Sequence, residues 1–204
     1  GIMQTSNGPV IFWQNGQRQL IPCEQIPARG AHQHMNMAIA AQLAADHSVS
    51  YEVIRETFIC FKGLKHRLEH MSMKGGRDWF DDSKATNPDA AAAALKSFEK
   101  TVWICGGLRK DLDLAALVPV AQKHVSHAFI IGEDTAPYAE MLKQADVSHT
   151  VAGTIKRAVT MASKQWGNDP VLLSPAAASQ DQFKNYVERG EAFSEAVESL
   201  GGGN

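Results

Sequence analysis

The last two thirds of the chain alternate between short apolar runs and helical stretches, with a polar or glycine-containing turn after each run. The runs have the length and composition of strands, and they follow one another about 20–26 residues apart. Alternation at this spacing is typical of βα units, so it predicts an α/β fold with a mostly parallel sheet covered by helices. The predicted strands are residues 77–80, 102–105, 128–131, 148–151 and 171–174.

The first part of the chain has a different pattern. Two short apolar runs within residues 9–21 flank Asn15-Gly16, which is a strong signal for a two-residue hairpin turn. Apolar residues then recur at helical spacing in two segments, and Ser50 stands where an N-cap would open the second. The predicted helices are residues 34–47 and 50–61.

The pattern changes between Gly63 and Met71, which predicts a domain boundary. We therefore expect two domains, residues 1–65 and residues 66–204. The connecting segment KHRLEH, residues 65–70, is dense in charge. Its periodicity does not distinguish a solvated linker from a functional segment.

The composition excludes several classes of partner. A net charge of −2 without a Lys/Arg run predicts no nucleic-acid partner, and no apolar stretch approaches the ~20 residues of a membrane helix. Cys23, Cys60 and Cys105 are scattered beside apolar neighbours, which indicates buried reduced thiols rather than a disulfide framework or a metal site. We expect a cytoplasmic monomer without membrane insertion.

Polar groups concentrate where the predicted strands end. DDSKAT follows the first strand, GGLRK the second and PAAASQDQFKN the last. Because the C-terminal ends of parallel strands lie at one edge of a sheet, we expect these loops to meet. Their cations, hydroxyls and helix-starting N–H groups would suit a carboxylate or a phosphate. The candidates are Lys84, Thr86, Lys110 and Ser179, the last of which we expect to cap a helix beginning at Asp181.

Each of these groups also has a purely structural interpretation. Asn87-Pro88 is an ordinary helix cap with a first-turn proline, and Gly106-Gly107 fits a tight turn without any ligand. A single lysine is most often a solvated charge, a serine can be only a cap, and Asp82 can serve only loop N–H groups. Convergence of all of them on one edge favours the anion site.

An earlier segment, GAHQHMNMA at residues 30–38, places polar side chains within helical reach of each other. These are His32, Gln33 and Asn36. A metal site there would need a further ligand that the sequence does not offer nearby, so we predict no metal site. The phosphate-binding pattern G-x-x-x-x-G-K-[ST] does not occur in the chain.

Four stretches together resemble the Mur ligase family, whose members are ATP-dependent amide-forming ligases of cell-wall precursor synthesis. GAHQHMNMAIAA is similar to the family's G-x-H-N-x-x-N-A helix, and GLKHRLE to its G-L-x-H-R-x-E hinge. DDSKATNPDA resembles N-D-S-K-A-T-N, and the segment from LLSPAAAS to VERGEAF resembles S-P-A-x-A-S-x-D-Q-F-x-x-F/Y-x-x-R-G. The last two patterns distinguish the branch of the family that adds D-glutamate.

The resemblance implies a Rossmann-like C-terminal domain preceded by the hairpin-and-helices end of an ATPase domain. It implies a complete enzyme that joins D-glutamate to UDP-N-acetylmuramoyl-L-alanine through an acyl phosphate, with ATP and Mg²⁺ as cofactors. The UDP-sugar domain, the phosphate loop and the metal ligands would lie upstream of this segment. We therefore expect the chain by itself to be inactive, with no metal ligands of its own.

The resemblance also implies roles for nucleotide-binding residues. Asn36 matches the family asparagine at the adenine, and Arg67 and Asp82 match groups at the ribose and phosphates. Lys84 matches a catalytic lysine near the terminal phosphate. His66, Arg67 and Glu69 belong to the hinge, which would let two domains close over ATP.

The implied amino-acid site contains four residues. Thr86, Lys110 and Ser179 match the binders of the two glutamate carboxylates, and Tyr186 falls where an aromatic ring packs beside the amino acid. A dianionic substrate needs a cation together with hydroxyl or N–H donors, and these loops offer them.

Three positions depart from the family pattern. Gln33 replaces the usual asparagine, Arg109 stands before Lys110 where an acid or glycine is common, and Gln180 replaces the leucine beside Ser179. These differences leave L-glutamate or another amino acid open as the substrate. A non-catalytic module that binds an amino acid or a nucleotide is the alternative from another class.

Overall fold

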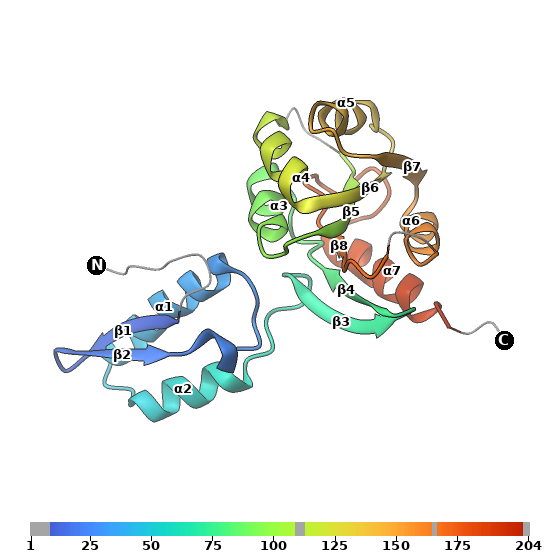
Figure 1. Ribbon diagram of the computed structural model, residues 1–204. Coiled ribbons are helices and arrows are strands. Elements are labelled where there is room, and N and C mark those ends of the chain that lie inside the picture. Colours follow the sequence, from blue (N-terminus) through green and yellow to red (C-terminus); the bar gives the residue numbers. More distant parts are fainter. Residues whose placement is uncertain (1–8, 109–112, 165–166, 202–204) are drawn as a thin grey trace. The chain divides into compact units, whose positions relative to one another are not determined.

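The chain forms two compact units, Gly1–Gly63 and Leu64–Asn204 (Figure 1). The computed structural model describes residues 9–108, 113–164 and 167–201. Among these residues, no helix is both long and apolar enough to span a membrane.

The first unit is built on the predicted hairpin. Strands β1 (Val10–Gln14) and β2 (Gln17–Ile21) pair antiparallel around Asn15 and Gly16, whose φ angles of 51° and 76° suit a tight hairpin turn. Helices α1 (Ala31–Asp46) and α2 (Tyr51–Cys60) cover it, and a short 3₁₀ turn (Cys23–Gln25) precedes them. The hydroxyl of Ser50 accepts a hydrogen bond from the Val53 N–H at 3.5 Å, which confirms the predicted cap.

The second unit is an α/β domain with a six-stranded sheet in the order β3-β4-β8-β5-β6-β7. The five predicted strands are all present, and they pair parallel with one another in that order. The apolar side chains of β4, β5, β6 and β8 are buried on both faces, as short continuous apolar runs require, whereas the edge strand β7 leaves Val151 exposed. The strands are β4 (Arg77–Asp81), β5 (Thr101–Gly106), β6 (Val125–Ile131), β7 (His149–Gly153) and β8 (Val171–Leu173).

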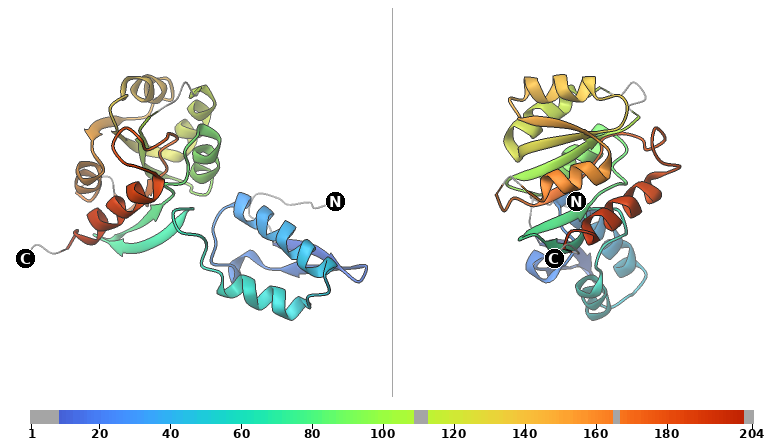
Figure 2. Two further views of the ribbon diagram at one scale, coloured as in Figure 1. Left: turned by 180° about the vertical axis from the view of Figure 1, so that it is seen from behind. Right: turned by 90° about the vertical axis from the view of Figure 1, so that its right-hand side faces the viewer.

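Helices cover both faces of this sheet (Figures 1 and 2). Helices α3 (Pro88–Leu95), α4 (Val118–His124) and α5 (Ala136–Gln144) pack on one face, with the 3₁₀ turn Ala115–Leu117 before α4. Helices α6 (Ile155–Ala162) and α7 (Tyr186–Glu198) pack on the other. Asn87 caps α3 by accepting from the Ala90 N–H at 2.9 Å, as predicted.

Strand β3 (Glu69–Lys74) was not predicted, because its polar sequence EHMSMK lacks the apolar run of the other strands. It is an edge strand that pairs antiparallel with β4 and contains a bulge between His70 and Ser72. The segment interpreted as a possible solvated linker therefore enters the sheet. Pairing with a buried neighbour, rather than its own propensity, holds β3 in place.

Two further sequence predictions were wrong. No helix begins at Asp181; helix α7 begins at Tyr186, where Asn185 accepts hydrogen bonds from two N–H groups of the first turn. Of the three cysteines only Cys105 is buried, whereas Cys60 is exposed and Cys23 is half-buried. All three thiols are free.

Candidate functional site

The loops after three adjacent strands are joined by backbone hydrogen bonds at the C-terminal edge of the sheet. The Asp82 N–H, after β4, donates to the Leu173 carbonyl of β8 at 2.8 Å. Leu108, after β5, exchanges two hydrogen bonds of 2.9 and 3.0 Å with Ala178, in the loop after β8. The predicted meeting of these loops is therefore observed for their described residues.

Two glycines at the end of β5 permit this close approach. Gly106 and Gly107 have φ angles of 113° and 133°, which only glycine adopts without strain. A Cβ on Gly106 would lie 2.1 Å from the Ile131 carbonyl oxygen, and one on Gly107 would lie 2.5 Å from that of Ala178. These glycines are required by the loop packing itself, whether or not a ligand binds.

Lys84 and Tyr186 are half-buried and lie against each other at this edge. The Lys84 ammonium lies 3.9 Å from the centre of the Tyr186 ring, although the two residues come from the loop after β4 and the start of α7. The Lys84 N–H donates to the His66 carbonyl at 3.0 Å, and the Thr86 N–H donates to the Lys84 carbonyl at 2.8 Å. A tight turn thus presents the half-buried side chains of Lys84 and Thr86.

Ser179 lies directly after the Leu108–Ala178 pair and is 1% exposed. Its carbonyl accepts from the N–H groups of Gln182 and Phe183, so this serine begins a turn rather than a helix. Lys110 and Arg109 fall outside the described residues.

Asp82 is buried beneath the loop, with 8% of its surface exposed. Its Oδ1 accepts from the Leu68 N–H at 3.1 Å, and its Oδ2 accepts from the Ser174 hydroxyl at 2.8 Å. Burial raises the pKa of Asp82 to about 7, against the opposing effect of these hydrogen bonds. Its predicted contact with a nucleotide stays a prediction.

Replacing Asp82 with asparagine is expected to change how stability depends on pH. The folded protein retains a proton on Asp82 up to about pH 7, whereas the unfolded chain releases it near its ordinary pKa of 3.8. As the pH rises from 4 to 7, the free energy of unfolding of the wild type therefore falls relative to that of Asp82→Asn, by at most about 1.4 kcal/mol per pH unit. Urea unfolding of both proteins at about pH 5 and pH 8 measures this difference.

The stability advantage of the asparagine variant over the wild type should be larger at about pH 8 than at about pH 5. Burial, together with nearby His149, lowers the pKa of His127 to about 4, which gives a trend of opposite sign in both proteins and cancels in their difference. A difference that does not vary with pH would contradict a buried, neutral Asp82.

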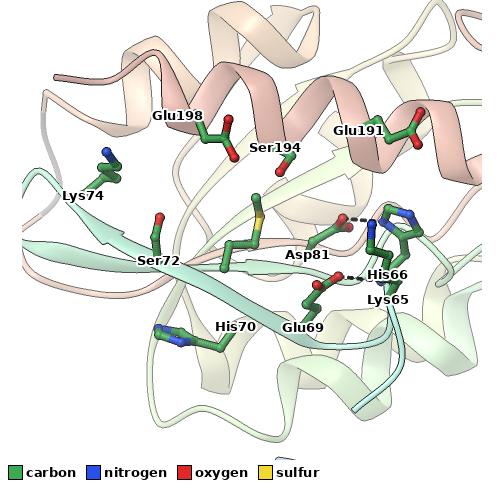
Figure 3. A pocket seen from close by; sticks show the side chains of 11 residues that line it. Lys65, His66, Glu69, His70, Ser72, Lys74, Asp81, Glu191, Ser194 and Glu198 are labelled. Atoms are coloured by element: carbon green, nitrogen blue, oxygen red, sulfur yellow. Dashed lines mark hydrogen bonds and ion pairs between the residues drawn. The ribbon is translucent and has the colours of Figure 1, made fainter. Parts of the chain in front are cut away.

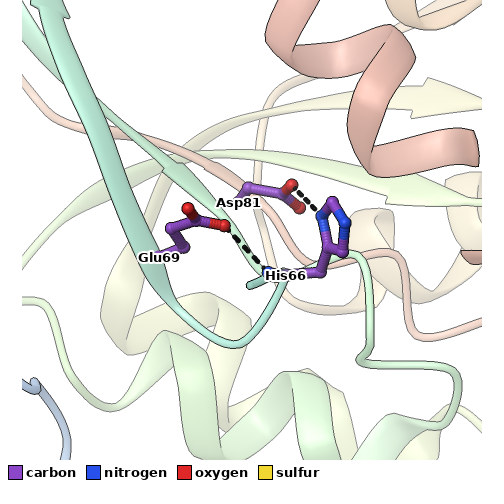
Figure 4. A group of neighbouring side chains, drawn as sticks. All are labelled: His66, Glu69 and Asp81. Atoms are coloured by element: carbon purple, nitrogen blue, oxygen red, sulfur yellow. Dashed lines mark hydrogen bonds and ion pairs between the residues drawn. The ribbon is translucent and has the colours of Figure 1, made fainter. Parts of the chain in front are cut away.

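His66, Glu69 and Asp81 form a compact cluster beside this loop (Figure 4). The His66 ring shares a 2.7 Å hydrogen bond from Nδ1 to Asp81, and the His66 N–H donates to Glu69 at 2.9 Å. Burial raises the pKa of Asp81, and the hydrogen bond with His66 opposes this. The ligand atoms lie within 4.8 Å of each other and could hold a metal ion, but here the His66 ring bonds to Asp81 and the Glu69 carboxylate accepts from the His66 backbone.

The hinge residues belong to the second unit, and this cluster fixes their conformation there. Besides the His66 bonds, the Leu68 N–H binds Asp82, so the segment is fastened to the loop after β4. His66 and Leu68 have positive φ angles of 62° and 50°, an uncommon conformation that the surrounding bonds must hold. Arg67, between them, is exposed. Its nucleotide contact and the hinge motion stay predictions.

A cavity of about 410 Å³ lies between β3 and α7 (Figure 3). The His66–Asp81 pair closes one end of it, and both lysines and carboxylates line it. The mixed charge favours neither an anion nor a cation. Its lining residues are Lys65, His66, Glu69, His70, Met71, Ser72, Lys74, Asp81, Glu191, Ser194 and Glu198.

Asn36 belongs to the other unit, where it is an exposed residue of α1. Within the second unit, the structure thus brings together Lys84, Thr86, Ser179 and Tyr186 around one edge of the sheet.

The sequence prediction missed two residues that support this edge, Arg189 and Gly190 of α7. Arg189 bonds to the loops after β4 and β8, and Gly190 packs directly against His66 and Asp81. Both belong to the R-G pair at the end of the quoted family pattern. The R-G pair was the sequence signal that could have identified these two residues, although their contacts depend on residues more than a hundred positions away.

The chain is similar to known proteins over most of its length. The UDP-N-acetylmuramoylalanine–D-glutamate ligase of Exiguobacterium sibiricum is 37% identical over 191 residues, which cover 92% of this chain and 42% of that protein. The enzyme of the same name from Rhizobium johnstonii is 41% identical over 179 residues, covering 85% and 38%. The chain thus spans about two fifths of the length of these relatives.

The fold is also shared with solved structures. Folylpolyglutamate synthase of Mycobacterium tuberculosis, complexed with ADP, matches with a TM-score of 0.58 and 16% identity, covering 84% of this chain and 41% of that one. Residues 66–177 match the family described as Mur ligase, glutamate ligase domain. Because that match spans more than half of the sequence and includes the loops after β4 and β5, the chain belongs to the Mur ligase family.

Proposed function

We propose that this chain is part of an ATP-dependent ligase that joins D-glutamate to UDP-N-acetylmuramoyl-L-alanine in the synthesis of the peptidoglycan precursor. The observation that carries the proposal is the pairing of Leu108 with Ala178 beside the loop of Lys84, in a chain similar to ligases named for this reaction. It brings the loops after three strands to one edge. The residues of these loops then act on one small, doubly negative substrate.

In the proposed reaction, the acceptor carboxylate takes the terminal phosphoryl group of ATP and ADP leaves. The amine of D-glutamate then attacks the acyl phosphate, an amide forms, and phosphate leaves with the amine losing a proton. This chain would supply positioning and positive charge rather than covalent chemistry. Lys84 would neutralise the terminal phosphate, while Thr86, Lys110 and Ser179 would hold the two glutamate carboxylates beside Tyr186.

Nucleotide binding is supported by the ADP complex of the related folylpolyglutamate synthase. We assign the adenine to Asn36 and the ribose and phosphates to Arg67, Asp82 and Lys84. Mg²⁺ would neutralise phosphate charge. The His66–Glu69–Asp81 cluster suits it poorly, because it includes an imidazole and is closed by its own hydrogen bonds. We therefore expect the Mg²⁺ ligands to lie outside this chain. We also expect the complete enzyme to be a cytoplasmic monomer.

Lys110→Ala in the complete enzyme is expected to impair the use of glutamate much more than that of ATP. A charge-assisted bond to a carboxylate is worth roughly 10–100-fold in kcat/KM, so kcat/KM for D-glutamate should fall by that factor. The KM for ATP should stay within about twofold. Steady-state assays with each substrate varied separately measure both values.

Lys123→Ala is the matched control, since Lys123 is an exposed lysine on α4, away from the loop after β4. Equal kcat/KM for glutamate in the wild type and Lys110→Ala would refute the role of Lys110. Incorporation assays with D-glutamate, L-glutamate and a diamino acid identify the substrate. Binding of an amino acid without any amide formation would instead favour the non-catalytic module.

A further inference from the structure

Arg189 is a buried cation that bonds to two of the loops at the proposed site. It lies on α7 and is 1% exposed. Its Nε donates to the Ser83 hydroxyl at 3.1 Å, and its Nη2 donates to the Ser83 carbonyl at 2.8 Å and the Ala177 carbonyl at 3.0 Å. One guanidinium thus connects the loop after β4 with the loop after β8.

The same guanidinium also reaches the loop after β5. A Cβ built on Gly107 would lie 3.2 Å from its Nη1, so Nη1 lies directly against this loop. Nη1 is buried and has no hydrogen-bond partner among the residues that the structure describes. Arg189 is therefore in contact with all three loops that carry the proposed substrate-binding residues.

A side chain of this kind is costly to bury, which argues against a role as simple packing. Burial lowers the pKa of Arg189 to about 10, so it still carries its charge at neutral pH. Its hydrogen bonds go to carbonyl and hydroxyl oxygens rather than to a carboxylate. The planar guanidinium can bridge two loops at fixed geometry, which the single ammonium of lysine cannot do.

The Ser83 hydroxyl extends this connection. It accepts from Arg189 and donates to the Tyr186 carbonyl at 2.7 Å. Arg189 is thereby linked to both Lys84 and Tyr186, which contact each other. It is linked to Lys84 through the adjacent residue Ser83, and to Tyr186 through the hydrogen bond of the Ser83 hydroxyl.

We propose that Arg189 is a positioning residue that fixes the loops after β4, β5 and β8 relative to one another, so that Thr86 and Ser179 bind one amino-acid substrate. Its role in substrate binding rests on the proposed function above, whereas its role in joining the loops does not. The two parts can be tested separately.

Hydrogen exchange on this chain tests the joining of the loops. In Arg189→Lys, hydrogen exchange at the amides of Lys84, Leu108 and Ala178 should accelerate about 10-fold or more. In the wild type the loops must break the guanidinium hydrogen bonds before these amides open to solvent, and the variant lacks those bonds. The Ala128 amide of β6, which donates to Ser148, should stay within about twofold.

Arg77→Lys is the matched control. Arg77 is another buried arginine that donates to backbone carbonyls, Ala162 and Gly167, but it begins β4 and so lies at the opposite edge of the sheet. It should leave exchange at the three loop amides unchanged. Unchanged loop exchange in Arg189→Lys, or equal acceleration at Ala128, would overturn the proposal.

If Arg189→Lys does not fold, Ser83→Ala provides the test. It removes the hydroxyl that joins Arg189 to Tyr186 but keeps both carbonyl acceptors. Exchange at Lys84 should then accelerate while exchange at Ala178 does not. Unchanged exchange at Lys84 would also overturn the proposal.

Kinetics of the complete enzyme test the second part. Arg189→Lys should raise the KM for D-glutamate about 10-fold and leave the KM for ATP within about twofold. Arg77→Lys should change neither. Loose loops with an unchanged KM for glutamate would reject the role in substrate binding. A wild-type enzyme that does not use D-glutamate would reject the proposed function, and hydrogen exchange would still decide whether Arg189 joins the loops.

Discussion

Gly190→Ala is expected to destabilise the Leu64–Asn204 unit by about 2–3 kcal/mol, because overpacking at a rigid contact costs this much. Gly190 lies inside α7, where alanine would normally be favoured by about 1 kcal/mol. The added Cβ, however, would lie 2.2 Å from His66 Nδ1 and 2.7 Å from Asp81 Oδ2. The predicted change is therefore opposite in sign to that of helix propensity.

The neighbours cannot easily move away. The His66 ring bonds to Asp81, and the His66 backbone bonds to Lys84 and Glu69. Urea unfolding of the wild type and the variant measures the loss of stability. Glu195→Ala, at an exposed position of the same helix, is the control and should stay within about 0.5 kcal/mol.

A double variant makes this test sharper. Replacing His66 with alanine removes the ring that the new methyl group would meet, so Gly190→Ala should cost less in that background. A Gly190→Ala protein as stable as the wild type would show that α7 does not need this close approach.

Lys84→Met is expected to lower kcat of the complete enzyme by about 10²–10³-fold, a typical loss when a group that stabilises transition-state charge is removed. Methionine retains the length of the side chain and can still pack on the Tyr186 ring. The cation–π contact at this half-buried position contributes only about 0.5–1 kcal/mol, so the variant should remain folded.

Rapid-quench measurement of acyl-phosphate formation would assign the loss to phosphoryl transfer. Lys96→Met, at the exposed end of α3, is the control and should retain wild-type kcat. A kcat for Lys84→Met within about threefold of the wild type would contradict the catalytic role of Lys84.

Local sequence signals predicted the elements whose causes are local. The Asn15-Gly16 turn and the Ser50 and Asn87 caps depend only on residues a few positions away, and all three were confirmed. Strands β4, β5, β6 and β8 were recognised because strands buried on both faces are continuously apolar.

The predictions that failed had competing local signals or none. Ser179 and Asn185 are both acceptable caps, and the structure uses Asn185. The Ser179 carbonyl closes a turn that does not continue as a helix, whereas the Asn185 side chain accepts from two N–H groups of the first turn of α7. Strand β3 has no apolar pattern and forms only because β4 offers an edge for pairing. Cysteine burial likewise depends on which helix face is covered, which the positions of Cys23 and Cys60 do not reveal.

By itself, the sequence determined the α/β class, the order of the strands along the chain and the loops that would carry polar groups. Its resemblance to a family supplied the roles of individual residues, which remain predictions. Only the tertiary structure decided that Arg189 joins Ser83 to Ala177 and that Gly190 admits His66 and Asp81. The reason is physical: periodicity and capping act within a turn of the chain, whereas a buried guanidinium is satisfied by whichever distant carbonyls the packed sheet brings within reach.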